Sequence, residues 1–187
     1  MAAVLILIDI QRGFDAPVWG ARNNSDAEQN AGCLLAHWRD HQAPVVHIRH
    51  VSIEPGSPLG PESGGTEFKP EVAPLAGETI FEKTVNSAFI GTGLEAHLRN
   101  IGATDLVICG LTTPHCVSTT TRMAANLGFR VRLAHDACAA FAANADSGWC
   151  EDMAALSPED IHRTALSHLH GEFAQVVSCA SLLRSTP

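Results

Sequence analysis

Short apolar runs alternate with amphipathic, helix-like segments along the whole chain. Most of the runs are β-branched and apolar at every position, which is typical of strands that are buried on both faces. Strict alternation of strand and helix predicts a parallel sheet that is covered by helices on both sides. The predicted strands are Val4–Ile8, Val45–Ile48, Thr79–Phe81, Leu106–Cys109, Val131–Ala134 and Gln175–Ser178.

Capping residues and glycines mark the ends of the helices. Ser25-Asp26-Ala27-Glu28 and Thr92-Gly93-Leu94-Glu95 have the spacing of capping boxes, and each opens an apolar stripe of helical period. A third helix is expected to end near Leu127-Gly128, where glycine suits the C-terminal position. Ser157 predicts the start of the last long helix, which should end at Gly171.

Two long connections interrupt the alternation. Pro55–Pro74 is rich in Pro, Gly, Ser and Glu, and we interpret it as an ordered excursion or lid because strands of one sheet flank it. Ala137–Ala155 is the second. The elements predict a three-layer α/β/α fold with a Rossmann-like, doubly wound, six-stranded parallel sheet, for which we assume the common strand order 3-2-1-4-5-6. The length of 187 residues suits a single domain over residues 1–187.

Composition and charge narrow the classes of function. The net charge is −8 and no run of Lys or Arg occurs, so we expect no nucleic-acid partner. The apolar start Met1–Ile10 is too short to span a bilayer and contains Asp9, so we expect a first strand and no membrane association. The six cysteines are scattered without a C-x-x-C pair, which favours reduced thiols and a cytoplasmic location.

Cys116 is the candidate nucleophile. It follows the fourth predicted strand, and Thr113 is predicted as the N-cap of the next helix with Pro114 at the first helical position. Cys116 then stands third in this helix, where unpaired N–H groups and the helix dipole favour a thiolate. The alternative interpretation is an inert buried cysteine, as most free cysteines are.

Two charged residues are expected to join this cysteine. In a doubly wound sheet, ligands bind beyond the carboxyl ends of the strands at the point where the strand order reverses. Asp9 ends the first strand, Lys83 follows the third, and Cys116 follows the fourth, so the assumed order brings all three to one crevice. Together they would supply a nucleophile, a proton acceptor and a cation. Taken singly, Asp9 is equally well explained as a loop cap and Lys83 as a surface charge.

Other motifs are weaker. His47 and His50 share one strand end, but no third metal ligand is near them in sequence. Gly91-Thr92-Gly93-Leu94-Glu95-Ala96 matches a dinucleotide-binding pattern only loosely and does not directly follow a strand. His115 is adjacent to Cys116, but neighbouring helical residues face apart. We therefore expect neither a cofactor nor a metal ion.

At this point several motifs, in this order and spacing, resemble those of the isochorismatase-like cysteine hydrolases over nearly the whole chain. The matching segments are Asp9-Ile10-Gln11 with Phe14, Lys83 with Ser87-Ala88-Phe89 and Gly91-Thr92-Gly93-Leu94, Gly110-Leu111-Thr112-Thr113-Pro114-His115-Cys116-Val117, Asp136-Ala137, and Gly171-Glu172-Phe173-Ala174.

The resemblance implies hydrolysis of a C–N bond in a small amide, ureide or carbamoyl compound through a covalent thioester. Cys116 would attack the carbonyl carbon, Asp9 would accept and return the proton, and Lys83 would hold Asp9 and stabilise the thiolate. The resemblance also implies a cis peptide bond at Leu111–Thr112, with the N–H groups of Thr112 and Cys116 forming an oxyanion hole.

The same resemblance implies a substrate pocket and a homo-oligomer, either a dimer or a tetramer. The expected pocket residues are Gln11, Phe14, Trp19, His50 and Phe89, with Arg22, Asn23 and Asn24 nearby. Nicotinamidases of the family carry an Asp-x-His metal site after the second strand, where this chain has His50-Val51-Ser52. That departure argues against nicotinamidase activity and against a bound metal ion.

Two alternatives remain open at the level of the sequence. The first is an isochorismate-type vinyl-ether hydrolase, which does not require a cysteine nucleophile and releases no ammonia. The second is a non-catalytic binding or scaffold protein that keeps the fold, although such a protein would usually have lost one of Asp9, Lys83 and Cys116.

Overall fold

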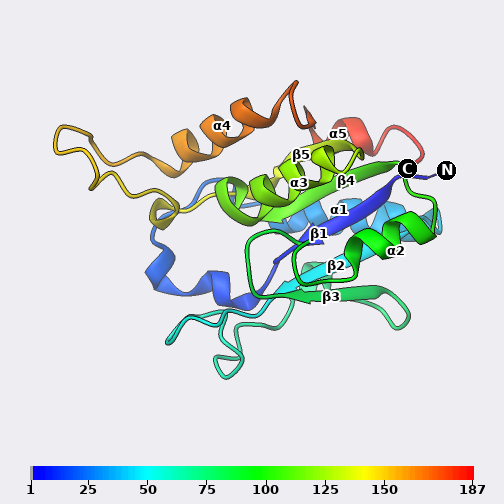
Figure 1. The fold of residues 1–187 in the computed structure, drawn as a ribbon, viewed down its shortest axis with the longest axis horizontal. Coiled ribbons are helices and arrows are strands. Elements are labelled where there is room, and N and C mark those ends of the chain that lie inside the picture. Colours follow the sequence, from blue (N-terminus) through cyan, green and yellow to red (C-terminus); the bar gives the residue numbers. More distant parts are fainter. Residues whose placement is uncertain (1) are drawn as a thin grey trace.

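The computed structural model describes residues 2–187, and Met1 lies outside the described part of the predicted domain. Its centre is a six-stranded parallel sheet with the order β3-β2-β1-β4-β5-β6. In Figure 1, β3, β2, β1 and β4 lie side by side in this order. The predicted fold class and strand order are therefore confirmed. The strands are β1 Val4–Ile8, β2 Val45–His50, β3 Thr79–Lys83, β4 Asp105–Leu111, β5 Arg130–Ala139 and β6 Gln175–Val177.

Helices cover both faces of this sheet. In Figure 1, α2 and α3 lie in front of the strands and α1 lies behind them. On the rear face α1 contacts α5, and on the front face α3 contacts α4. The helices are α1 Ala27–Asp40, α2 Leu94–Asn100, α3 Ser118–Asn126, α4 Pro158–Leu169 and α5 Cys179–Leu182. A π-helical turn, Thr113–Val117, links β4 to α3.

The core lies on both sides of the central strands. Every residue of β1 is buried, which explains why Val4–Ile8 is apolar at each position and does not alternate. From α1, the buried Trp38 packs into this core and donates a hydrogen bond from Nε1 to the Ala3 carbonyl at 2.7 Å. Burial on two faces thus fixes β1 as the centre of the sheet.

Of the four predicted helix starts, three differ in detail, among them the one at Thr113. The helix α1 begins at Ala27, and no side chain caps its N-terminus. The predicted capping box does not form because the Glu28 carboxylate bonds to Arg22 and Lys69. The helix α2 likewise has no capping box; the hydroxyl of Thr92 donates to the Ala88 carbonyl. Ser157 does cap α4, since its side chain accepts from the Asp160 N–H.

Several strands extend beyond their predicted ends, toward the carboxyl edge of the sheet. The strand β2 reaches His50, β3 reaches Lys83 and β4 reaches Leu111. The strand β5 continues to Ala139, so the prediction that a connection begins at Ala137 is wrong. Polar or small residues interrupt the apolar pattern at these ends, although the backbone pairing continues.

The connection between β2 and β3 is an excursion that folds back over the start of the chain. Gln11 and Phe68 form an antiparallel bridge, and the Gly13 N–H donates to the Gly65 carbonyl at 2.8 Å. A Cβ at Gly65 would lie 2.7 Å from the Gly13 Cα, so the close approach requires glycine. This contact fixes the excursion beside the carboxyl end of β1.

The connection between β5 and α4 projects from the body of the molecule, at the left of Figure 1. Trp149 in this projection is 79% exposed. None of the helices in residues 2–187 combines the length and the apolar character that crossing a bilayer requires.

Candidate active site

The carboxyl ends of three strands bring Asp9, Lys83 and Cys116 together. Asp9 directly follows β1 and adopts a left-handed φ of 52°, which is uncommon for a residue other than glycine and turns the chain sharply at this point. Lys83 is the last residue of β3, and Cys116 lies in the turn that follows β4. The predicted convergence at the reversal of strand order is thus observed.

The ammonium group of Lys83 is the centre of this cluster. Its Nζ donates to Asp9 Oδ2 at 2.6 Å, to Cys116 Sγ at 3.3 Å and contacts His50 Nδ1 at 2.9 Å. The side chains of Lys83 and Asp9 are both fully buried. An ammonium carries three hydrogens, so these three contacts use its whole donor capacity.

The protonation of this cluster differs from the prediction. Burial and the neighbouring Asp9 carboxylate raise the pKa of the Cys116 thiol, although Lys83 opposes them. Burial and the Asp9 charge thus oppose the thiolate that the helix N-terminus was expected to favour. Burial also raises the pKa of Asp9. Its Oδ1 is buried without a hydrogen-bond partner among residues 2–187, so it is free to accept a proton.

The backbone between β4 and Cys116 is unusual in two respects. The Leu111–Thr112 peptide bond is cis, and Gly110 has a φ of 130°. A Cβ at Gly110 would lie 2.0 Å from the Ile8 carbonyl oxygen, so only glycine fits between β4 and β1 here. The N-cap of the turn is Thr112 and not, as predicted, Thr113.

The hydroxyl of Thr113 instead contacts a buried histidine. Thr113 Oγ1 lies 2.8 Å from His162 Nδ1, and the Asn24 amide lies 3.3 Å from His162 Nε2. Both hydrogens of the Asn24 amide already go to the carbonyls of His135 and Cys138, so the contact with Thr113 is the one that joins the His162 ring to this turn. This neutral ring ties α4 to the turn that carries Cys116, and burial lowers the pKa of His162 to about 4.

His162 should therefore make the fold sensitive to mild acid. Between pH 6.5 and about 4, His162 is protonated in the unfolded chain but stays neutral in the folded protein. The free energy of unfolding therefore rises with pH in this window. One such histidine contributes up to about 1.4 kcal/mol per pH unit. Urea unfolding at pH 5 and pH 7 should show a smaller pH difference for His162→Asn than for the parent, and equal differences would contradict this account.

Cys116 opens onto a cavity of about 220 Å³. Its wall combines aromatic and aliphatic surface with a few polar groups, and Glu54 is its only acidic side chain. The wall consists of Phe14, Trp19, His50, Ser52, Glu54, Ser57, Leu59, Asn86, Thr112, His115, Cys116 and Asn144. A volume of this size suits a small substrate.

Three of the five predicted pocket residues line this cavity. Phe14 and Trp19 form an aromatic wall with ring centroids 5.1 Å apart, and His50 lies beside Lys83. Gln11 does not line it, because its amide bonds to both the N–H and the carbonyl of His50 and so holds the end of β2. Phe89 packs in the main core against Phe129.

The three residues expected near the pocket also have structural roles. Arg22 forms an ion pair with Glu28, and the Asn23 side chain accepts from the Ala140 N–H. Asn24 bonds to the carbonyls of His135 and Cys138 as well as contacting His162. All three thus fix residues 22–24 to neighbouring segments of the chain.

Sequence reasoning missed Asn86 and Asn144. Asn86 Oδ1 lies 3.8 Å from Cys116 Sγ, and Asn144 lines the cavity from the start of the projecting connection. Asn86 stands three residues after Lys83, within reach of the recognised motif. Asn144 follows an alanine-rich stretch and has no comparable signal.

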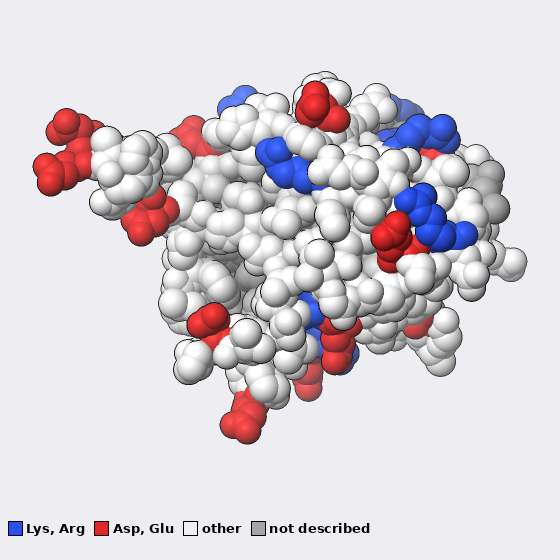
Figure 2. Space-filling model, viewed as in Figure 1, with Lys and Arg blue, Asp and Glu red and all other residues white. Residues whose placement is uncertain are grey.

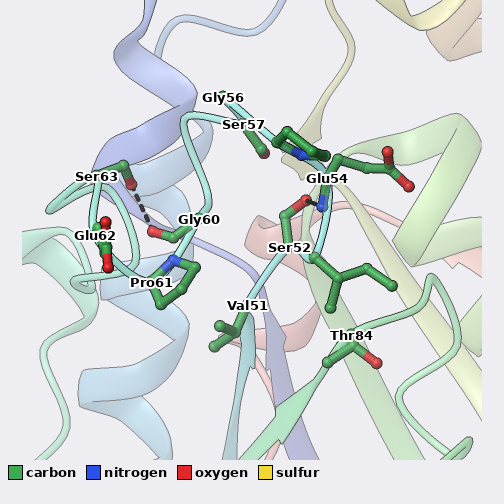
Figure 3. A pocket seen from close by; sticks show the side chains of 12 residues that line it. Val51, Ser52, Glu54, Gly56, Ser57, Gly60, Pro61, Glu62, Ser63 and Thr84 are labelled. Atoms are coloured by element: carbon green, nitrogen blue, oxygen red, sulfur yellow. Dashed lines mark hydrogen bonds between the residues drawn. The ribbon is translucent and has the colours of Figure 1, made fainter.

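A second hollow adjoins the first. Figure 3 shows it between the end of β2 and the turn of Gly60–Ser63. Ser52, Glu54 and Ser57 line both hollows, so this stretch separates them. In Figure 3 the Glu54 side chain points away from Gly60 and Pro61.

The same cluster contains the donor types that a metal ion would use. One carboxylate oxygen of Asp9, one ring nitrogen of His50 and the Cys116 sulfur lie within 4.8 Å of one another. All three residues also contact Lys83 Nζ, so a cation already stands among them. The residues present therefore do not suit a metal ion at this point.

Comparison with known proteins agrees with this geometry. A model of the isochorismatase domain matches residues 3–181. The isochorismatase family protein YrdC of Bacillus subtilis (strain 168) is 45% identical over 179 residues, covering 96% of this chain and 93% of its own. Streptothricin hydrolase of Streptomyces noursei is 34% identical over 137 residues, covering 73% of this chain and 49% of its own.

Solved structures give the same result. An isochorismatase family member from Chromobacterium violaceum ATCC 12472 superimposes with a TM-score of 0.91 and 45% identity, covering 98% of this chain and 92% of its own. A cysteine hydrolase from Pseudomonas syringae pv. phaseolicola 1448A has a TM-score of 0.85 and 26% identity, covering 98% of this chain and 91% of its own. The chain thus belongs to the isochorismatase family of cysteine hydrolases.

Proposed function

We propose that this protein hydrolyses a C–N bond of a small amide, ureide or carbamoyl compound through a thioester on Cys116. One observation carries the proposal: the buried Lys83 ammonium bridges the Asp9 carboxylate and the Cys116 sulfur at 2.6 and 3.3 Å, beneath a cavity that reaches the sulfur. A nucleophile, a base and a cation in contact are the parts that acyl transfer needs.

In the first half-reaction, Cys116 Sγ attacks the carbonyl carbon and its proton passes to the Asp9 carboxylate. The raised pKa of the thiol supports this order, because the proton rests on sulfur until a base removes it. The C–N bond then breaks, and Asp9 returns the proton to the leaving amine. The Lys83 ammonium stabilises the negative charge as it moves from the carboxylate to the sulfur.

In the second half-reaction, water attacks the thioester and the acid leaves. Asp9 accepts a proton from the water and returns it to the sulfur, which restores the thiol. We propose the backbone N–H groups of Thr112 and Cys116 as the oxyanion hole of both steps. This assignment is supported by the presence of both residues on the same cavity wall.

The cavity supports a small and uncharged reacting group. Phe14, Trp19 and Leu59 offer apolar surface, and the volume of about 220 Å³ leaves little room beyond one small ring or a short chain. On the face in Figure 2, basic side chains are few and dispersed among acidic ones, which gives a polyanionic partner little to bind.

The proposal is tested with a panel of primary amides, ureides and N-carbamoyl compounds. The parent protein should release ammonia from at least one of them, and an acid quench followed by intact-mass and peptide analysis should locate an acyl group on Cys116. Ammonia release without an acylated Cys116 would contradict the covalent route. A panel that yields no ammonia, together with cleavage of a vinyl ether, would contradict the proposal as a whole.

A further inference from the structure

The contact between Lys83 and His50 fixes which nitrogen of the His50 ring carries the proton. Lys83 Nζ lies 2.9 Å from His50 Nδ1, and an ammonium has no lone pair with which to accept. Nδ1 must therefore be the acceptor and must be unprotonated. The neutral ring then has its proton on Nε2.

The surroundings of His50 keep the ring neutral at ordinary pH. Burial and the Lys83 charge together lower the pKa of His50 to about 4. On the other side, Gln11 holds the His50 backbone through both its N–H and its carbonyl, at 2.7 and 2.9 Å. The ring is thus fixed in tautomer by Lys83 and in position by Gln11.

The Nε2–H group is left free for a ligand. No side chain or carbonyl within residues 2–187 accepts from Nε2, and this nitrogen is not among the fully buried unpartnered atoms. His50 lines the cavity that reaches Cys116, and its nearer ring nitrogen lies within 4.8 Å of the attacking sulfur. Only one ring carbon separates the two ring nitrogens, so the Nε2–H group stands near the sulfur and beside the place where a scissile carbonyl would bind.

We propose that His50 is a substrate-binding residue whose Nε2–H selects amides with a hydrogen-bond acceptor close to the scissile carbonyl. This inference rests on the proposed function and narrows its substrate class. The acceptor is an uncharged oxygen or nitrogen, because the neutral ring offers one N–H and no positive charge. A site that is built to donate such a bond discriminates against a substrate that lacks the acceptor.

The tautomer is tested without any substrate. Two-bond ¹H–¹⁵N spectra of the histidine-labelled protein at pH 7 should show His50 with a bare Nδ1 and a protonated Nε2. Comparison with His50→Asn assigns the signals. Protonation on Nδ1 would overturn the inference and leave the proposed function intact.

The selection is tested with the three pyridinecarboxamides and benzamide, which differ only in one ring atom. At least one pyridinecarboxamide should have a kcat/KM about tenfold above that of benzamide, the effect of one net hydrogen bond. The intrinsic reactivity of each amide is the same for every variant, so a change in this ratio reports on the side chain that was replaced.

Two variants separate recognition from the positioning of Lys83. In His50→Asn the amide oxygen reaches the place of Nδ1 and still accepts from Lys83, but the Nε2–H donor is lost. The ratio of kcat/KM for the preferred pyridinecarboxamide to that for benzamide should then fall toward one. In His50→Gln the amide reaches the place of Nε2, so the ratio should persist while turnover of all four amides falls. The control is His97→Asn, because His97 lies in α2 and does not line the cavity, so its loss should leave the ratio unchanged.

Equal loss of turnover with all four amides in His50→Asn would mean that His50 acts only through Lys83, and would overturn the inference. Equal kcat/KM for the four amides with the parent protein would also overturn it, although the proposed function would stand. If the parent hydrolyses none of these and no other amide of the wider panel, both fail together.

Discussion

The Cys116→Ala variant should lose hydrolytic activity by a factor of about 10⁴ or more. Removal of the sulfur removes the thiol in contact with the Lys83 ammonium, and without it the proposed thioester cannot form. The fold should survive, because alanine fits where cysteine stood in a small, buried position. The measurement is ammonia release from whichever amide the parent cleaves best, with circular dichroism as the check on folding.

A matched control is Cys109→Ala in β4, which leads into the same turn. Cys109 is buried, and burial raises the pKa of its thiol well above the usual value. It lies inside the sheet and does not line the cavity. Its removal should leave kcat/KM within a few-fold of the parent, and comparable losses in both variants would contradict a specific role for Cys116.

Replacement of Lys83 by methionine should lower the free energy of unfolding by about 3–5 kcal/mol. The reason is that Asp9 would remain as a buried carboxylate without its counter-ion. The double variant Asp9→Asn/Lys83→Met carries neither charge. Its loss of unfolding free energy should be smaller, by at least about 2 kcal/mol, than the sum of the losses in the two single variants. The measurement is a double-mutant cycle in urea at pH 7.

The neighbouring pair Arg49–Glu82 serves as the control for this cycle. It joins β2 and β3 one register position before His50 and Lys83, and the Glu82 side chain is 59% exposed. Glu82→Gln should cost less than about 1 kcal/mol, because water screens an exposed pair. Additive losses at Asp9 and Lys83 would show that the two charges do not depend on one another.

The sheet and the convergence of the three residues were predictable because both follow from robust patterns. Strands apolar at every position must be buried on two faces, which led to the parallel sheet. Asp9 and Lys83 interrupt such runs at the edge where ligands bind, and Cys116 follows Pro114 at a helix start. Each of these signals is local in the sequence.

The details that were not predictable depend on contacts between distant segments. Apolar periodicity stops at His50 and Lys83, yet the two residues are paired in the ladder of β2 and β3. The helix dipole favours a thiolate at Cys116, but burial and the Asp9 charge outweigh it. Gln11 was expected to bind substrate, whereas its amide is taken up by the backbone of a residue 39 positions away.

The excursion between β2 and β3 has a consequence for how substrate range can diverge. It supplies Ser52, Glu54, Ser57 and Leu59 to the cavity wall, whereas Asp9, Lys83 and Cys116 belong to the ends of separate strands. Insertions or exchanges within residues 52–64 would reshape the cavity without moving the reacting groups. A lineage with this architecture can thus acquire new substrates by altering one surface segment. Grafting that segment between homologues would transfer substrate preference and leave the three reacting residues in place.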